Sequence, residues 1–114
     1  MEKPNQPLIR RAQEIPVVPT RRSGIKQQPF LGPADSAHQN ILLIQAEQDA
    51  EVEVHHVANS ESFFLLEGRL RVFGPGFDQR LGPGDVCYFP EETAHGVTCI
   101  EGPCRFLVIF APAG

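Results

Sequence analysis

The chain has 114 residues, a formal net charge of −4 and ordinary shares of apolar and charged residues, which together indicate one globular domain. It contains no run of about 18 apolar residues that could cross a bilayer, and its start lacks the apolar stretch of a secretion signal. We therefore expect a cytoplasmic protein without a membrane span. Eleven prolines and ten glycines, spread over the whole length, argue against long helices and favour short strands joined by turns.

Residues 1–33 form a proline-rich, basic N-terminal arm. Residues 1–30 hold six Lys or Arg against two acidic residues, whereas the remainder holds four against twelve. The arm has neither interleaved aromatic residues nor a recognition helix, so we do not expect nucleic-acid binding, and we expect the arm to lie on an acidic body. Because proline is confined to sheet edges, the arm is at best an edge or exchanged strand, and residues 24–33 form a second loose stretch. Ile15, Val17 and Val18 suit the sheet edge of a partner, so we expect a homodimer.

Residues 34–114 read as a single all-β domain. The run at residues 41–44 is apolar on both faces, as in a covered strand, and the last run, residues 105–110, is also strongly β-forming. Tight turns rich in glycine and proline punctuate the segments between them. The pattern predicts a sandwich or barrel of about eight to ten short strands, the intervening strands being expected at residues 52–57, 61–68, 69–73, 77–81, 86–89 and 97–100.

Three histidines and a glutamate are the candidates for chemistry. His55 and His56 are adjacent, and neighbouring residues on a regular strand point to opposite faces, so only one of them can face inward. His56 shares its face with Val52 and Val54, which favours His56, although a β-bulge at the pair would favour His55 instead. A hairpin through residues 58–60 would return Glu61 to the neighbourhood of the pair.

The spacing around Glu61 resembles the first motif of the cupin family, in particular small single-domain cupins of the RmlC-like type. That motif has two histidines one residue apart, a glutamate three or four residues later and a glycine after six more. Glu61 and Gly68 fit the last step, and His56 stands where the second histidine belongs. A second register places His55 first; it resembles the arrangement in 3-hydroxyanthranilate dioxygenase.

The segment GPGDVCYFPEETAHG resembles the second cupin motif, which runs from a glycine through a proline and a glycine to a histidine and an asparagine. Gly84, Pro90 and His95 match, whereas Glu92 replaces the second glycine and Cys99 the asparagine. The resemblance covers residues 39–110 and implies a double-stranded β-helix, or jelly-roll barrel, without substantial helices. The basic arm lies outside it.

The resemblance implies a site inside the barrel. His56, Glu61 and His95, with His55 in the alternative register, form a donor set that suits iron, manganese, nickel or zinc. Aromatic and apolar side chains facing the interior would form the wall of a pocket for a small organic ligand. We expect this wall to include Val54, Phe63, Leu65, Tyr88 and Cys99.

Two functions follow from this set and stay open at the level of sequence. One is a metal-dependent enzyme, either a dioxygenase or an isomerase or lyase that acts through an enolate. The other is a metal-free binding or regulatory module, which is favoured by the loss of one motif histidine. The three cysteines, Cys87, Cys99 and Cys104, have no metal-type spacing and are expected to be free thiols.

Overall fold

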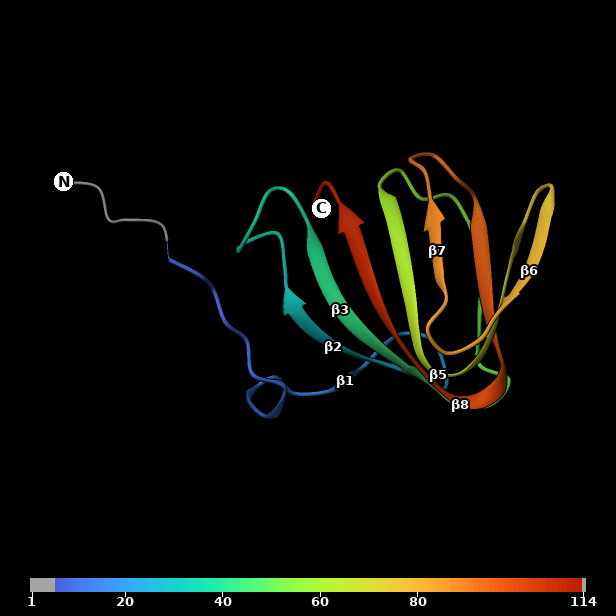
Figure 1. The fold of residues 1–114 in the computed structure, drawn as a ribbon, viewed down its shortest axis with the longest axis horizontal. Coiled ribbons are helices and arrows are strands. Elements are labelled where there is room, and N and C mark those ends of the chain that lie inside the picture. The colour runs from blue at the N-terminus through green and yellow to red at the C-terminus, as the bar shows by residue number, and fades with distance from the viewer. Residues whose placement is uncertain (1–5, 114) are drawn as a thin grey trace.

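The computed structural model describes residues 6–113, and within this range the protein is almost entirely β-structure (Figure 1). This confirms the all-β prediction. Helices stay short because prolines and glycines interrupt the chain. No helix in the described range is long and apolar enough to cross a membrane. In chain order the elements are the 3₁₀ helix η1 (Ala12–Glu14), β1 (Val18–Pro19), β2 (Ile25–Leu31), β3 (Asn40–Ala46), β4 (Glu51–His55), β5 (Ser60–Gly74), β6 (Phe77–Leu81), β7 (Val86–Phe89) and β8 (His95–Ala111).

The strands pair antiparallel and fold into two layers that face each other (Figure 1). One layer has the order β1, β2, β3, the C-terminal part of β8, the N-terminal part of β5, and β7. The other has the order β4, the N-terminal part of β8, the C-terminal part of β5, and β6. Because β5 and β8 belong to both layers, they hold the barrel together.

The sequence predicts strand ends where β5 and β8 only bend. Separate strands are expected on either side of Gly68, and again between residues 100 and 105, but each strand continues through its bend. Gly68 has φ +86°, and a Cβ there would lie 2.6 Å from the Cys104 Sγ and from the carbonyl oxygen of Pro103. Glycine is therefore needed at this bend both for its backbone conformation and for the close approach of β8.

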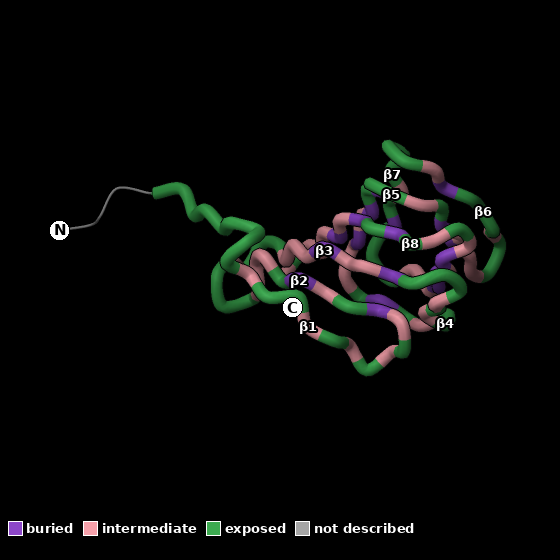
Figure 2. The backbone as a smooth tube through the Cα atoms, turned by 90° about the horizontal axis from the view of Figure 1, so that it is seen from below, coloured by how far each residue is buried: buried purple, intermediate pink, exposed green. Residues whose placement is uncertain are grey.

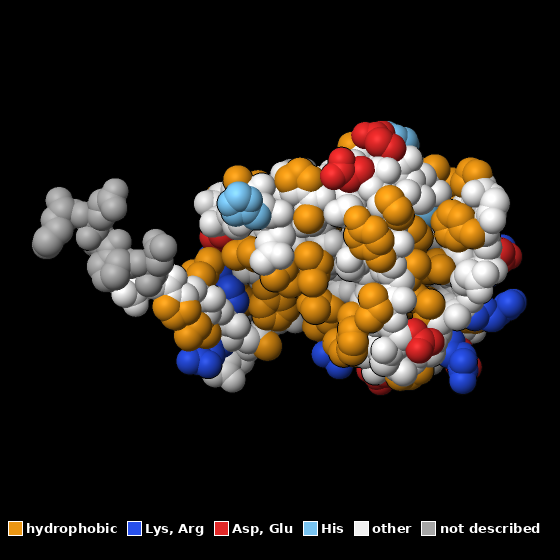
Figure 3. All heavy atoms as spheres, turned by 45° about the horizontal axis from the view of Figure 1, so that its top comes forward, with side chains coloured by type: hydrophobic (Ala, Val, Ile, Leu, Met, Phe, Trp, Pro, Cys, Tyr) orange, Lys and Arg blue, Asp and Glu red, His pale blue; other side chains and the backbone are white. Residues whose placement is uncertain are grey.

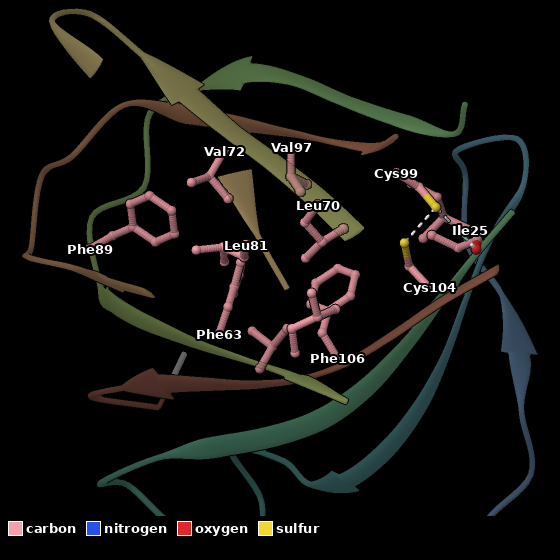
Figure 4. Close-up of a cluster of buried hydrophobic side chains, with 13 residues drawn as sticks. Ile25, Phe63, Leu70, Val72, Leu81, Phe89, Val97, Cys99, Cys104 and Phe106 are labelled. Atoms are coloured by element: carbon pink, nitrogen blue, oxygen red, sulfur yellow. Dashed lines mark hydrogen bonds between the residues drawn. The ribbon is translucent and has the colours of Figure 1, made fainter. Parts of the chain in front are cut away.

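The core lies between the two layers and runs the length of the barrel (Figures 2 and 4). Phe63 is at its centre, with ring centroids 5.2 Å from Phe89 and 5.1 Å from Phe106. Such offset aromatic pairs add to the gain from burying their area. Leu65 and Leu70, on either side of the β5 bend, are 0% and 1% exposed.

The arm contributes more to the sheet than its proline content predicts. β2 lies within the stretch expected to be loose, yet it pairs along its length with β3, and β1 pairs with β2 at the edge of the sheet. The side chain of Gln28 donates hydrogen bonds to the carbonyl oxygens of Ala12 (2.7 Å) and Ile15 (2.9 Å), which ties the segment around η1 to the sheet. Residues 6–11, which precede η1, lead away from the barrel (Figure 1).

Candidate ligand and metal site

Glu61 and His95 lie at the start of β5 and β8 and meet inside the barrel. They are 5% and 1% exposed, and the His95 Nε2 is 2.8 Å from the Glu61 Oε1. The His95 Nδ1 lies 3.2 Å from the carbonyl oxygen of Thr93. Because buried polar groups are costly without partners, this chain of contacts fixes both side chains.

His55, at the end of β4, is the second histidine of the site. Its backbone pairs with that of His95, and the two ring centroids are 5.6 Å apart. The His55 Nδ1 lies 2.9 Å from the carbonyl oxygen of Glu53. In each ring Nδ1 faces a backbone carbonyl, an arrangement that commonly orients metal-binding histidines. The Nε2 of His55 is then left for a ligand, whereas the Nε2 of His95 faces Glu61.

A register shift between Val52 and His55 determines which histidine faces inward. It interrupts the strict alternation that favoured His56, so that His55 lines the pocket and His56 does not. The His56 side chain is 62% exposed, and its Nε2 contacts the Glu92 carboxylate. The expected inward orientation of His56 is thus wrong, and the alternative orientation of His55 is the one observed.

Of the other residues expected in the pocket wall, some face the barrel interior and some face its outer surface. Phe63 lines the pocket, and Leu65 and Cys99 are buried in the core beyond it. Val54 is 43% and Tyr88 61% exposed, and neither contacts the pocket. Val54 shares the register shift that turns His56 outward, and Tyr88 is on the outer face of β7, opposite Ser62 of β5.

Aromatic side chains hold the His95 ring in place. The Phe89 ring stacks on it at a centroid distance of 3.8 Å and an interplanar angle of 6°. Phe63 meets the same ring edge-on, at 6.1 Å and 79°. The imidazole therefore has little freedom to rotate and presents a fixed edge to Glu61.

The pocket beside these residues has a volume of about 180 Å³ and a mainly apolar wall. Such a wall with a few convergent polar groups is typical of small-molecule sites. Its polar groups are His55, Glu61, His95, Gln27 and Arg22. Its apolar side chains are those of Leu42, Ile44, Val52, Phe63, Val97, Phe106, Val108 and Phe110.

Arg22 and Gln27 belong to the arm, and the sequence offered no signal that they reach the pocket. Arg22 is held in place by Glu53, to which its Nη2 and Nε donate at 3.1 and 3.4 Å. The same hydrogen bonds lower the pKa of Glu53 below its usual value. Gln27 is brought to the pocket by the pairing of β2 with β3, opposite Ile44.

The residue types at this site suit a divalent metal, but their side chains are not positioned to hold one. Two imidazoles and a carboxylate suit first-row metals, and both rings have their Nδ1 atoms engaged by backbone carbonyls. However, Glu61 is bonded to His95, and within residues 6–113 no three His, Cys, Asp or Glu side chains are grouped so as to hold a metal ion. Metal binding would require the hydrogen bond between Glu61 and His95 to open.

Comparison with known proteins shows which fold this chain shares. A family model described as "Cupin domain" matches residues 40–110. An RmlC-like cupin from Shewanella frigidimarina has a TM-score of 0.82 at 22% identity, with 95% of this chain and 93% of that chain covered. KdgF from Halomonas sp. has a TM-score of 0.80 at 19% identity, covering 90% and 92%.

A third similar structure is the polyketide cyclase RemF from Streptomyces resistomycificus. It has a TM-score of 0.80 at 18% identity, with 93% of this chain and 80% of that chain covered. The comparison with curated proteins gives no match. At these identities the structural likeness shows the fold alone.

Proposed function

This chain belongs to the cupin family, and we propose that its barrel binds a small organic ligand beside a divalent first-row metal held by His55, Glu61 and His95. The observation that carries the proposal is the shared orientation of the two histidines, whose Nδ1 atoms both face backbone carbonyls. This leaves Nε2 of each ring as the metal donor, next to a buried carboxylate. Iron, manganese, nickel and zinc are all compatible with these donors.

Each residue has a separate task in this proposal. His55, Glu61 and His95 supply the donors, while stacking of Phe89 keeps the His95 ring from turning. The apolar wall excludes water and receives the body of the ligand. A bound divalent ion would supply a Lewis acid for a carbonyl group of the ligand.

Elemental analysis of protein purified without a histidine tag tests the metal. We expect about one first-row metal ion per chain, and we expect His55→Ala and His95→Ala to lose most of it. His56→Ala is the matched control, because this neighbouring histidine is exposed and faces Glu92, so the variant should keep its metal. Equal metal loss from His55→Ala and His56→Ala would contradict the proposed donor set.

A second candidate is a binding module that works without metal. It is favoured by the direct hydrogen bond between Glu61 and His95, which satisfies both buried groups on their own. Wild-type protein that carries well below one metal per chain, and that binds small apolar ligands equally well with and without chelator, would support this candidate over the first.

A further inference from the structure

Cys99 and Cys104 form a pair of buried thiols at the bend of β8. Neither residue lines the proposed ligand pocket. Their side chains point toward each other, with the two Sγ atoms 2.6 Å apart (Figure 4). They are 1% and 0% exposed, and both are free thiols. The third cysteine, Cys87, is on β7 and half-buried.

The fold brings these thiols together from both layers of the barrel. Cys99 is on the part of β8 that pairs with Leu70 of β5, whereas Cys104 is on the part that pairs with Ala46 of β3. Gly68 provides the space for Cys104, because a Cβ at that position would lie 2.6 Å from its Sγ. The thiols are therefore held in contact by the barrel itself and need to move by less than about 1 Å to reach bonding distance.

Two carbonyl oxygens and a cavity lie beside Cys104. The Cys104 Sγ is 3.2 Å from the carbonyl oxygen of Arg69 and 3.4 Å from that of Glu101. Cys104 also borders a cavity of about 300 Å³, whose other lining residues include Lys26, Glu67 and Arg105. Cys99 does not line this cavity. Of the two thiols, Cys104 is the one beside the cavity; because it is 0% exposed, an oxidant reaches its sulfur when the cavity wall opens locally.

We propose that Cys99 and Cys104 are an oxidation site, which hydrogen peroxide converts into an intramolecular disulfide. The Cys104 sulfur attacks one peroxide oxygen, the O–O bond breaks, and the thiol proton leaves with the other oxygen as water. The Cys99 sulfur then attacks the resulting sulfenic acid, the S–S bond forms and the S–O bond breaks. The hydroxyl leaves as a second water with the Cys99 proton.

The order of attack follows from the environments of the two thiols. Burial and the neighbouring Cys104 raise the pKa of the Cys99 thiol, so little of it is thiolate at neutral pH, and the order of attack is assigned from the cavity alone. Cys104 has the cavity on its side. Cys99 therefore acts second, on a sulfur that is already in contact with it.

Thiol counting on the full chain tests the proposal. Reduced protein is treated with hydrogen peroxide at neutral pH, denatured, labelled with N-ethylmaleimide and measured by intact mass spectrometry. We expect the labelled thiols to fall from three to one, with the remaining label on Cys87, and the unlabelled mass to fall by two hydrogen atoms. Dithiothreitol should restore three labels.

Variants identify the partners. Cys87→Ser is the matched control, because it keeps the pair and should fall from two labels to none. Cys99→Ser should form no disulfide and should instead accumulate a sulfenic acid on Cys104, which dimedone traps. Three labels remaining on wild-type protein, or peptide mapping that finds Cys87 in the disulfide, would overturn the proposal.

Discussion

The side chains of Glu61 and His95 share one hydrogen bond in the pocket, whose other polar lining residues are His55, Gln27 and Arg22. Glu61 has the His95 ring as its side-chain partner, and the ring is enclosed by Phe63 and Phe89. Removing either group would leave the other polar and buried among aromatic rings. The pair is therefore important for stability whether or not a metal replaces the hydrogen bond between them.

We expect His95→Ala to lower the free energy of unfolding by about 3–5 kcal/mol, because it strands the buried Glu61 and leaves a cavity beside Phe89. Urea unfolding followed by circular dichroism measures the change. His38→Ala serves as control, since His38 is exposed and should shift stability by less than about 0.5 kcal/mol. A loss below about 1 kcal/mol for His95→Ala would show that Glu61 finds other partners.

For single residues, the sequence predicted the site correctly where the spacing of a motif identified the residue. Motif spacing identified Glu61 and His95, and the structure brings them together. The choice between His55 and His56 rested on strict alternation, which the register shift after Val52 breaks. A bulge of this kind depends on pairing with β8, so residues near the histidines could not reveal it. For the same reason Arg22, which reaches the pocket from the arm, had no local signal.

At the scale of elements, the predicted strands match the structure with two exceptions. Strand β2 was missed because residues 24–33 read as loose, and a glycine can bend a strand without ending it. Turns such as the one between β5 and β6 appear where glycine and proline predicted them. Gly68 reads in the sequence as the same kind of signal, but β5 continues through it because β8 bends alongside. Whether a glycine ends a strand or bends it is decided by its partner across the sheet, which local sequence does not contain.

We expect Gly68→Ala to be far more damaging than Gly76→Ala. Both residues have positive φ, +86° and +84°, so both changes incur backbone strain of roughly 1–2 kcal/mol. Only at Gly68 would the new methyl group meet Cys104 and the backbone of β8, which adds about 1–3 kcal/mol of overpacking. Thermal unfolding of the two variants measures the difference, and equal melting temperatures would mean that the bend relaxes freely.

For the whole molecule, the outer face of one layer remains apolar. Phe64 and Leu66 of β5 and Val86 and Tyr88 of β7 are 41–61% exposed, and Val86 lies directly opposite Phe64. Broad groups of hydrophobic side chains are visible on the body of the molecule (Figure 3). Since such surfaces commonly mark interfaces, we predict that a second copy covers this face, which differs from the contact through Ile15, Val17 and Val18 expected from the sequence.

We predict that Val86→Glu weakens self-association, because it places a charge in the middle of this face. Sedimentation velocity at several concentrations should show dimers for the wild type and a shift toward monomers for the variant. Gln39→Glu introduces the same charge in an exposed loop and should leave the wild-type behaviour unchanged. A monomeric wild-type protein at high concentration would exclude the dimer.

The position of β8 has a consequence for how the protein is made. This strand follows all the others in the chain, yet it lies between β3 and β5 in one layer and between β4 and β5 in the other. While the ribosome is still synthesising β8, neither layer can close, and the earlier strands emerge with unpaired edges that are prone to aggregation. Closure of the barrel must await the last strand, so a chaperone that shields these edges during translation should raise the yield of native protein.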